Sequence, residues 1–292
     1  MPESSPQRRA NSLSPHVFYL SAPSGRLFTL FRPPLASAAK RNRLVILVAP
    51  FGEEMNASRR AYSVLSQNLA ASGIASLMFD FYGCGDSEGE FADASWQTWL
   101  QDLRSIVVYA RQQWPEQTLQ FLGLRSAALL IAEHIGNEGA DNIERVVLWQ
   151  PLLHGSEQVD QFLRLRLAAN ILQAQSAQRE TTQTLREIAR LQGRVEVAGY
   201  ELSATLIDAL DQRQWLSLLQ AARQCPPLTW LELGAHTELS GLRAQTAQGL
   251  RQHGIALECQ HVVCKRFWAI ADAPLPLALL ERTRQILLAD QP

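Results

Sequence analysis

The sequence predicts an α/β protein whose mostly parallel central sheet is covered by helices on both faces. Short runs of apolar residues alternate along the chain with longer segments of helical spacing. This order is typical of parallel strands joined by helical crossovers. The run 44–49 is apolar at every position, as expected of a strand that is buried on both faces of such a sheet.

The expected elements follow one another along the chain. Two β-rich runs, 17–20 and 27–32, flank the turn sequence Pro23-Ser24-Gly25 and predict a hairpin at the edge of the sheet. Further strands are expected at 44–49, 74–79, 118–122, 145–149, 228–233 and 256–263. Helices are expected at 58–72, 95–113, 126–135, 241–253 and 276–288. Ser95 is a favourable N-cap residue, and Gly73 and Pro115 are typical of helix ends.

The alternation of strands and helices breaks at Pro151. From about residue 155 to 223 the chain is rich in Gln, Arg and Leu and shows helical spacing without a convincing buried strand. We therefore expect a helical cap at 155–223, inserted into a sheet domain formed by 17–154 and 224–292. The polar residues 1–16 are expected to be a disordered lead-in.

Composition excludes several classes of function. The chain has 292 residues, of which 27 are basic and 28 acidic, so its net charge of −1 favours neither nucleic acid nor an anionic membrane. Its four cysteines show no CxxC spacing, which argues against zinc and for reduced thiols in the cytoplasm. No apolar run is long enough to span a bilayer. We expect a cytoplasmic protein with neither a metal nor another cofactor.

The most informative segment, 121–128, predicts a strand, a sharp turn and a helix. α/β-Hydrolases present their nucleophilic serine on such a turn, within the motif G-x-S-x-G. Here the motif reads Gly123-x-Arg125-x-Ala127, so an arginine stands at the position of the serine. A guanidinium stays protonated and is not a nucleophile. Ser126 comes one position later, where about 100° of helical rotation turns its side chain away from the site.

The loop after strand 44–49 would supply an oxyanion-hole N–H in such a fold. It contains Phe51 and Gly52, followed by Glu53 and Glu54. We expect one of these glutamates to pair with Arg125, because an unpaired buried charge is costly. Either glutamate is also compatible with a solvated acidic loop. Negative charge here would oppose the stabilisation of an oxyanion, which acyl transfer needs.

A second loop supports the same fold. The sequence from Asp80 to Ser87 matches the pattern D-x-x-G-x-G-x-S, which follows a buried strand in α/β-hydrolases. Its glycines permit a tight exit from the sheet. The expected role of this loop is structural, and a generic Gly/Asp turn is the alternative.

No histidine is clearly placed to act as a catalytic base. The base is expected after the last strand, but the sequence there runs from Cys264 to Trp268 and His261 lies within the strand. His154 opens the cap and His236 follows strand 228–233, yet both are more typical of surface histidines. Among the aromatic residues, three could line an apolar pocket or belong to the core: Phe51, Trp149 and Trp268.

Several longer segments closely resemble one family of α/β-hydrolase-like proteins. They are PFGEEMNASRR, FDFYGCGDSEGEFADASWQTWLQDL, FLGLRSA, VVLWQPLLHG, QFLRLRLA, VEVAGYELS and the late FW. Two hydrolase-like proteins are associated with the exosortase A system, and the resemblance is to the family of the second. Its members are found with exopolysaccharide and PEP-CTERM sorting genes in Gram-negative bacteria. The resemblance extends over about 17–288. It implies an α/β-hydrolase fold, a cytoplasmic protein tied to envelope polysaccharide or protein sorting, and Arg125 as a family trait.

Two functions remain open from the sequence. In the first, a scaffold without serine-hydrolase turnover binds an anionic or acyl small molecule, with Arg125 at the floor of the pocket. In the second, the protein is an ester or thioester hydrolase or an acyltransferase that uses a displaced Ser126. His154 or His236 would then be the base, and N–H groups near Phe51 and Gly52 would bind the oxyanion. The sequence does not identify a protein partner.

Overall fold

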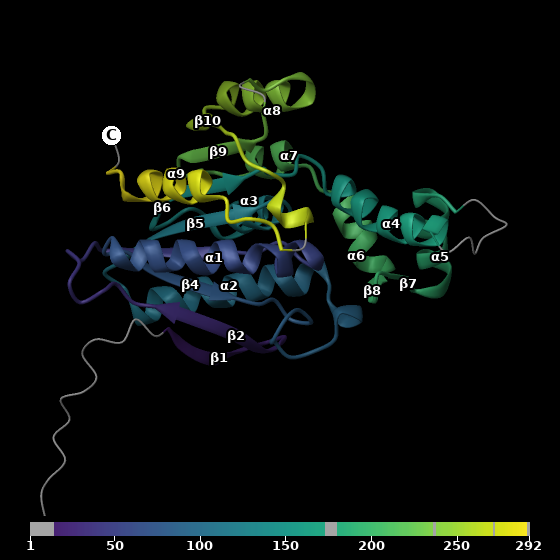
Figure 1. Ribbon diagram of the computed structural model, residues 1–292, viewed down its shortest axis with the longest axis horizontal. Coiled ribbons are helices and arrows are strands. Elements are labelled where there is room, and N and C mark those ends of the chain that lie inside the picture. Colours follow the sequence, from purple (N-terminus) through teal and green to yellow (C-terminus); the bar gives the residue numbers. More distant parts are fainter. Residues whose placement is uncertain (1–14, 173–179, 236–237, 271, 291–292) are drawn as a thin grey trace, which may run out of the picture.

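The centre of the protein is an eight-stranded sheet. The computed structural model describes residues 15–172, 180–235, 238–270 and 272–290. Within them the strand order is β1-β2-β4-β3-β5-β6-β9-β10 (Figure 1). Strand β2 runs antiparallel to β1 and β4, and every other pair of neighbours is parallel. The predicted α/β fold with a mostly parallel sheet is confirmed.

The strands lie close to the positions expected from the sequence. They are β1 (His16–Ala22), β2 (Gly25–Arg32), β3 (Arg43–Val48), β4 (Ala75–Phe79), β5 (Thr118–Leu124), β6 (Ile143–Trp149), β9 (Leu228–Leu233) and β10 (Leu257–Val262). The apolar run in β3 is buried from Leu44 to Val48, because helices cover both faces of the sheet at this point.

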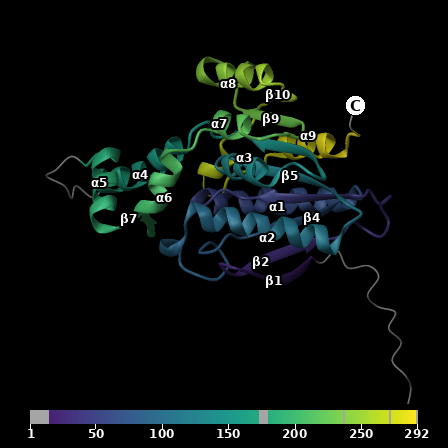
Figure 2. The ribbon, with the colours of Figure 1, turned by 180° about the vertical axis from the view of Figure 1, so that it is seen from behind.

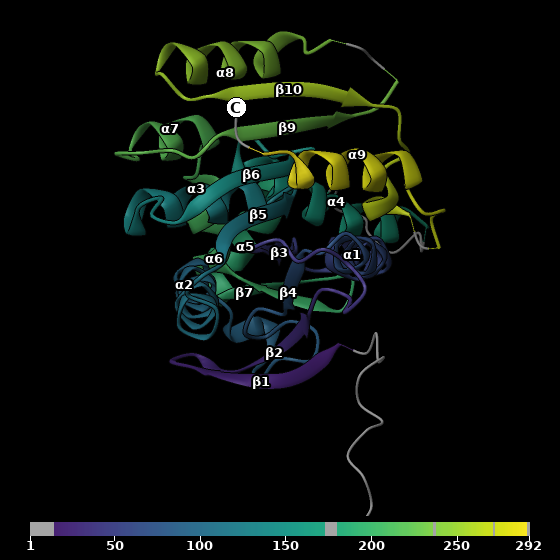
Figure 3. The same ribbon diagram turned by 90° about the vertical axis from the view of Figure 1, so that its left-hand side faces the viewer.

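The helices that cover the sheet form two layers. They are α1 (Glu53–Ala71), α2 (Trp96–Gln113), α3 (Ala127–Glu138), α7 (Trp215–Gln220), α8 (Gly241–Gln252) and α9 (Leu277–Leu288). Helices α1 and α9 pack together on one face, and α2, α3, α7 and α8 contact one another in sequence on the other (Figure 3). There are also two short 3-10 turns, η1 (Phe91–Asp93) and η2 (Phe267–Ala269), and η2 packs against α1.

Local sequence explains the helix ends that matter for the site. Helix α1 begins at Glu53, earlier than expected, because Glu53 and Glu54 occupy its first turn, where acidic side chains are stabilised by the helix dipole. Gly52 precedes it with a φ of 63°, a conformation that glycine adopts without strain. Ser95 caps α2 as predicted, and its side chain accepts a hydrogen bond from the Thr98 N–H.

Most elements of the segment 155–223 form a group beside the sheet (Figures 1 and 2). They include α4 (Gly155–Leu172), α5 (Thr182–Gln192), β7 (Arg194–Val197), β8 (Tyr200–Ser203) and α6 (Ala204–Asp211). The β7–β8 hairpin is separate from the main sheet and differs from the purely helical cap that the sequence suggested. Its turn residues Ala198 and Gly199 both have positive φ. The last helix of the segment, α7, packs against α3 and α8, and the division into core and cap stays a prediction.

Two other expectations concern the ends and the membrane. The predicted lead-in, 1–16, falls outside the described residues up to position 14, and His16 opens β1. In the part of the chain that the structure describes, no helix combines the length and apolar character that crossing a bilayer requires.

Candidate functional site

The turn between β5 and α3 has Arg125 at its apex. Arg125 has a φ of 54°, a left-handed conformation that non-glycine residues adopt rarely and that often marks functional turns. The turn is tightly packed beneath, because a Cβ on Gly123 would lie 2.7 Å from Ile131 Cδ1. The predicted strand, sharp turn and helix are therefore present, with an arginine at the apex.

The Arg125 side chain is buried and satisfied from three directions. Its side chain is 6% exposed, and its Nε lies 3.3 Å from Glu54 Oε1. The guanidinium also donates a hydrogen bond to Gln161 Oε1 on α4. On a third side its central carbon lies over the ring of Trp268, 5.7 Å from the centroid, within the range of a cation–π contact.

The two glutamates at the start of α1 have different roles. Glu54 pairs with Arg125, as expected for one of the two residues. Burial raises the pKa of Glu54, and the adjacent Arg125 opposes this increase. Glu53 instead accepts a hydrogen bond from the Tyr200 hydroxyl of β8, at 2.8 Å. The same hydroxyl accepts one from Asn56, so Tyr200 ties the hairpin to α1.

A cavity of about 540 Å³ opens beside this ion pair. Three segments line it: the start of α1 with the preceding loop, one face of α4, and η2 with the following residues. The lining residues are Phe51, Glu53, Glu54, Asn56, Ala57, Gln158, Gln161, Phe162, Leu165, Trp268, Ala269, Ile270 and Asp272. The described lining contains three carboxylates, those of Glu53, Glu54 and Asp272, and contains neither Lys nor Arg. Arg125 contacts lining residues without lining the cavity itself.

The sequence was compared with models of known protein families and with curated proteins. A family model described as serine aminopeptidase, S33, matches residues 39–229. The chain belongs to this family. None of the curated proteins compared with the chain matches it.

Solved structures extend the likeness of this S33-family chain to nearly its full length. Est1E from Butyrivibrio proteoclasticus with bound ferulic acid has a TM-score of 0.67 at 16% identity, covering 93% of this chain and 98% of its own. An esterase from Pyrococcus furiosus has a TM-score of 0.61 at 14% identity, with coverages of 98% and 94%. Proline iminopeptidase from Mycobacterium smegmatis has a TM-score of 0.58 at 12% identity, with coverages of 93% and 97%. These likenesses concern the fold, and the predicted α/β-hydrolase fold is confirmed.

Of the aromatic residues suggested for a pocket in this S33-family protein, Phe51 and Trp268 line the cavity. Gly52 adjoins it, since a Cβ at this position would lie 2.9 Å from Phe162 Cε2. Trp149 is corrected to a core residue. Its side chain is fully buried, and its indole N–H donates to Thr283 Oγ1 on α9 at 2.8 Å.

Neither Ser126 nor His154 is among the described residues that line the cavity. Ser126 is 1% exposed, and its Oγ has no hydrogen-bond partner among the described residues. His154 is half-buried at the start of α4 and forms an isolated β-bridge with Gln214. His236 lies outside the described residues. No histidine is found among the described residues that line the cavity.

Sequence reasoning did not find the wall that α4 contributes. The lining residues of α4 are Gln158, Gln161, Phe162 and Leu165. Gln158 lies three residues before Gln161 and four before Phe162, and Leu165 lies four after Gln161 and three after Phe162, so all four lie on one face of the helix. This spacing was the signal in the sequence that could have revealed the wall, because it places two glutamines on the same helix face as Phe162 and Leu165.

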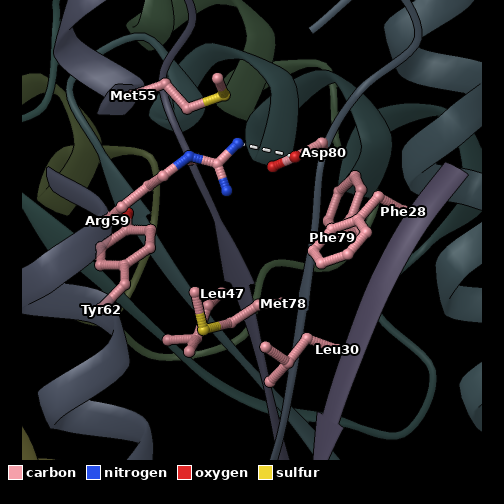
Figure 4. Close-up of a pocket in the computed structure, with 10 residues that line it drawn as sticks. Phe28, Leu30, Leu47, Met55, Arg59, Tyr62, Met78, Phe79 and Asp80 are labelled. Atoms are coloured by element: carbon pink, nitrogen blue, oxygen red, sulfur yellow. Dashed lines mark hydrogen bonds and ion pairs between the residues drawn. The ribbon is translucent and has the colours of Figure 1, made fainter. Parts of the chain in front are cut away.

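A second, smaller cavity of about 50 Å³ lies between α1 and strands β2, β3 and β4 (Figure 4). Its walls are mostly apolar, and the Arg59–Asp80 ion pair of 2.7 Å lies at one end. A Cβ on Gly85 would lie 2.2 Å from both the Asp80 carboxylate and the Arg59 guanidinium. Gly85 thus leaves room for the Arg59–Asp80 ion pair, and this pair connects the Asp80–Ser87 loop to α1.

Proposed function

We propose that this S33-family protein binds a small molecule with an acyl or other apolar part in the 540 Å³ cavity, without the turnover of a serine hydrolase. The observation that carries the proposal is the buried Arg125–Glu54 ion pair. Arg125 occupies the position at which an α/β-hydrolase presents its serine, and Trp268 follows the strand after which the histidine is expected.

The chemistry of these side chains supports binding over hydrolysis. A protonated guanidinium offers donors but no lone pair for attack, and an indole N–H takes up no proton. The Glu54 carboxylate adds negative charge close to the loop from which oxyanion donors would come, which disfavours a developing oxyanion. Ser126 is buried within the turn, which disfavours its use as a displaced nucleophile.

The lining of the cavity refines the expected ligand. Phe51, Phe162, Leu165, Trp268 and Ile270 offer apolar surface for an acyl chain or a ring. The charge of Arg125 is neutralised by Glu54, and the described lining carries further carboxylates without a cation. The lining therefore favours an acyl ligand and disfavours the anionic ligand that Arg125 alone suggested.

We also propose that the chain is a member of the second exosortase A-associated hydrolase group and acts in the cytoplasm in an exopolysaccharide context. The resemblance over about 17–288, including Gly-Leu-Arg at 123–125, supports this assignment. Deletion of the gene is expected to change the amount or export of exopolysaccharide. Unchanged polysaccharide and unchanged sorting of surface proteins in the deletion strain would contradict it.

The binding function is tested by two parallel screens on the purified protein. A panel of p-nitrophenyl esters and acyl thioesters is expected to show no turnover above the buffer blank. A thermal-shift screen of acyl compounds is expected to give hits, because a ligand that binds only the native state stabilises it. Ala57→Phe, which fills the cavity, should abolish these shifts. Ester turnover that disappears in Ser126→Ala would support the displaced-serine enzyme instead.

A further inference from the structure

The carboxamide of Gln161 connects the cavity to the arginine at the turn. Gln161 is at an exposed position on α4 and lines the cavity, and its Oε1 accepts a hydrogen bond from the Arg125 guanidinium. A guanidinium has donors only, whereas a carboxamide has an oxygen that accepts and a nitrogen that donates. The contact therefore fixes which end of the carboxamide faces Arg125, and it leaves Nε2 for another partner.

Arg125 has little freedom to release this contact. Its side chain is 6% exposed, and its Nε is held 3.3 Å from Glu54 Oε1. On another side its central carbon lies over the ring of Trp268. A buried donor that loses its acceptor is costly, which favours the orientation in which Gln161 keeps its oxygen on Arg125.

The nitrogen of Gln161 is the carboxamide donor that remains for a ligand. In the part of the chain that the structure describes, Nε2 of Gln161 donates to no acceptor. The other carboxamides of the described lining are engaged. Asn56 donates to the Tyr200 hydroxyl at 3.2 Å, and Gln158, which is 2% exposed, forms a hydrogen bond with Glu54.

The surroundings of Gln161 favour a neutral acceptor over an anionic one. The charged residues of the described lining are all carboxylates, so an anion would be repelled. Phe162 and Leu165 lie on the same face of α4 as Gln161 and offer apolar surface. A carbonyl oxygen with an apolar chain or ring beside it matches both features.

We propose that Gln161 binds the carbonyl oxygen of the acyl ligand through Nε2, and that Arg125 is the positioning residue that holds the carboxamide in this orientation. This inference rests on the proposed binding function and assigns the residue that recognises the acyl group. The donor comes from a side chain of the inserted segment 155–223, and the apolar part of the ligand lies against Phe162 and Leu165.

The test compares two neutral probes of the same shape, acetophenone and α-methylstyrene, in which a methylene group replaces the carbonyl oxygen. Each probe is titrated into isotope-labelled protein, and nuclear magnetic resonance gives the Kd together with the signals of the side-chain amides. The Gln161 signal, identified by its absence from Gln161→Glu, should move downfield with acetophenone. It should stay nearly in place with α-methylstyrene.

The positioning by Arg125 is tested with the double variant Arg125→Met and Glu54→Gln, which removes the guanidinium without leaving a buried charge. A carboxamide that is free to turn over presents its nitrogen about half of the time, so the Kd of α-methylstyrene divided by that of acetophenone should fall about twofold. An unchanged ratio in this variant would contradict the positioning. The amide spectrum shows directly whether each variant is folded.

Gln161→Glu separates ligand recognition from a merely structural role. A carboxylate still accepts from Arg125 but has no N–H for the ligand, so the same ratio should fall about fivefold, as the loss of one neutral hydrogen bond implies. Gln97→Glu, at an exposed position outside the cavity, makes the same change of charge and should leave the ratio unchanged. An unchanged ratio in Gln161→Glu would overturn the inference while binding in the cavity stands. If neither probe binds the wild-type protein, both proposals are contradicted.

Discussion

The guanidinium of Arg125 lies over the ring of Trp268, 5.7 Å from its centroid, although the two residues follow different strands, β5 and β10. In α/β-hydrolases the nucleophile stands at a sharp turn between a strand and a helix, and the histidine base comes later in the chain. Here the fold brings together one side chain from such a turn and one that follows the last strand. The pair that meets here has neither a nucleophilic atom nor a group that accepts a proton.

Replacing Arg125 with serine restores the hydrolase motif but leaves Glu54 buried without its cation. Breaking a buried ion pair in this way typically costs about 3–5 kcal/mol, so the free energy of unfolding, measured by urea titration, should fall clearly. No ester turnover is expected, because no described histidine lines the cavity.

The double variant Arg125→Ser with Glu54→Gln serves as the control for this substitution. It removes the unpaired charge and should recover part of the lost stability. An unchanged melting temperature in Arg125→Ser would contradict the ion pair. Turnover of p-nitrophenyl esters by that variant would reveal a competent base.

The contact between Arg125 and Trp268 can be measured separately by a double-mutant cycle. Arg125→Met and Trp268→Leu are combined, and the coupling in the free energy of unfolding is determined. A cation–π contact at a desolvated site predicts a coupling of about 0.5–2 kcal/mol. Strict additivity of the two single changes would show that the ring only fills space.

Gly123 should tolerate no side chain. An added Cβ would lie 2.7 Å from Ile131 Cδ1 and 3.2 Å from Ala127 Cβ, so Gly123→Ala is expected to cost about 1–3 kcal/mol of stability. Gly249→Ala in α8 is the matched control, since its Cβ would meet Leu216 at 3.4 Å and alanine favours a helix. Equal denaturation midpoints for the two variants would contradict the close packing at the turn.

The sequence predicted much of this site because its features are local. The strand–Gly123–helix pattern placed Arg125, and two adjacent glutamates narrowed its partner to Glu53 or Glu54. Which one pairs depends on the β7–β8 hairpin, whose Tyr200 accounts for Glu53. The strands Arg194–Val197 and Tyr200–Ser203 are only four residues long, too short for a clear alternating signal.

The sequence left Trp149 open between a pocket and the core for a related reason. A tryptophan at the end of a strand can turn toward a pocket or toward the covering helix, and only tertiary packing decides. Here α9 provides Thr283 as the acceptor for the indole N–H, which holds Trp149 in the core. Long-range partners of this kind leave no mark on the local sequence.

His134 should make stability depend on pH in mild acid. Burial, assisted by Arg111 and Arg104, lowers the pKa of His134 from 6.5 to about 4. The fold therefore disfavours the protonated form of His134. Above pH 6.5 the histidine is neutral in both the folded and the unfolded state, and the free energy of unfolding falls as the pH drops from 6.5 toward 4. The loss should reach about 3 kcal/mol relative to His134→Leu, because a tenfold change in proton affinity between the unfolded and folded states corresponds to about 1.36 kcal/mol. Parallel stability profiles for both proteins would contradict this effect.

We propose that the Arg125 turn supports binding without acyl-transfer chemistry. The most direct measurement is intact-protein mass spectrometry after incubation with a fluorophosphonate, which modifies activated serines. We expect the wild-type protein and Ser126→Ala both to remain at their unmodified masses under conditions that fully label an active serine hydrolase. A stoichiometric adduct on the wild-type protein that is absent from Ser126→Ala would show that Ser126 is an activated nucleophile, and would contradict the account.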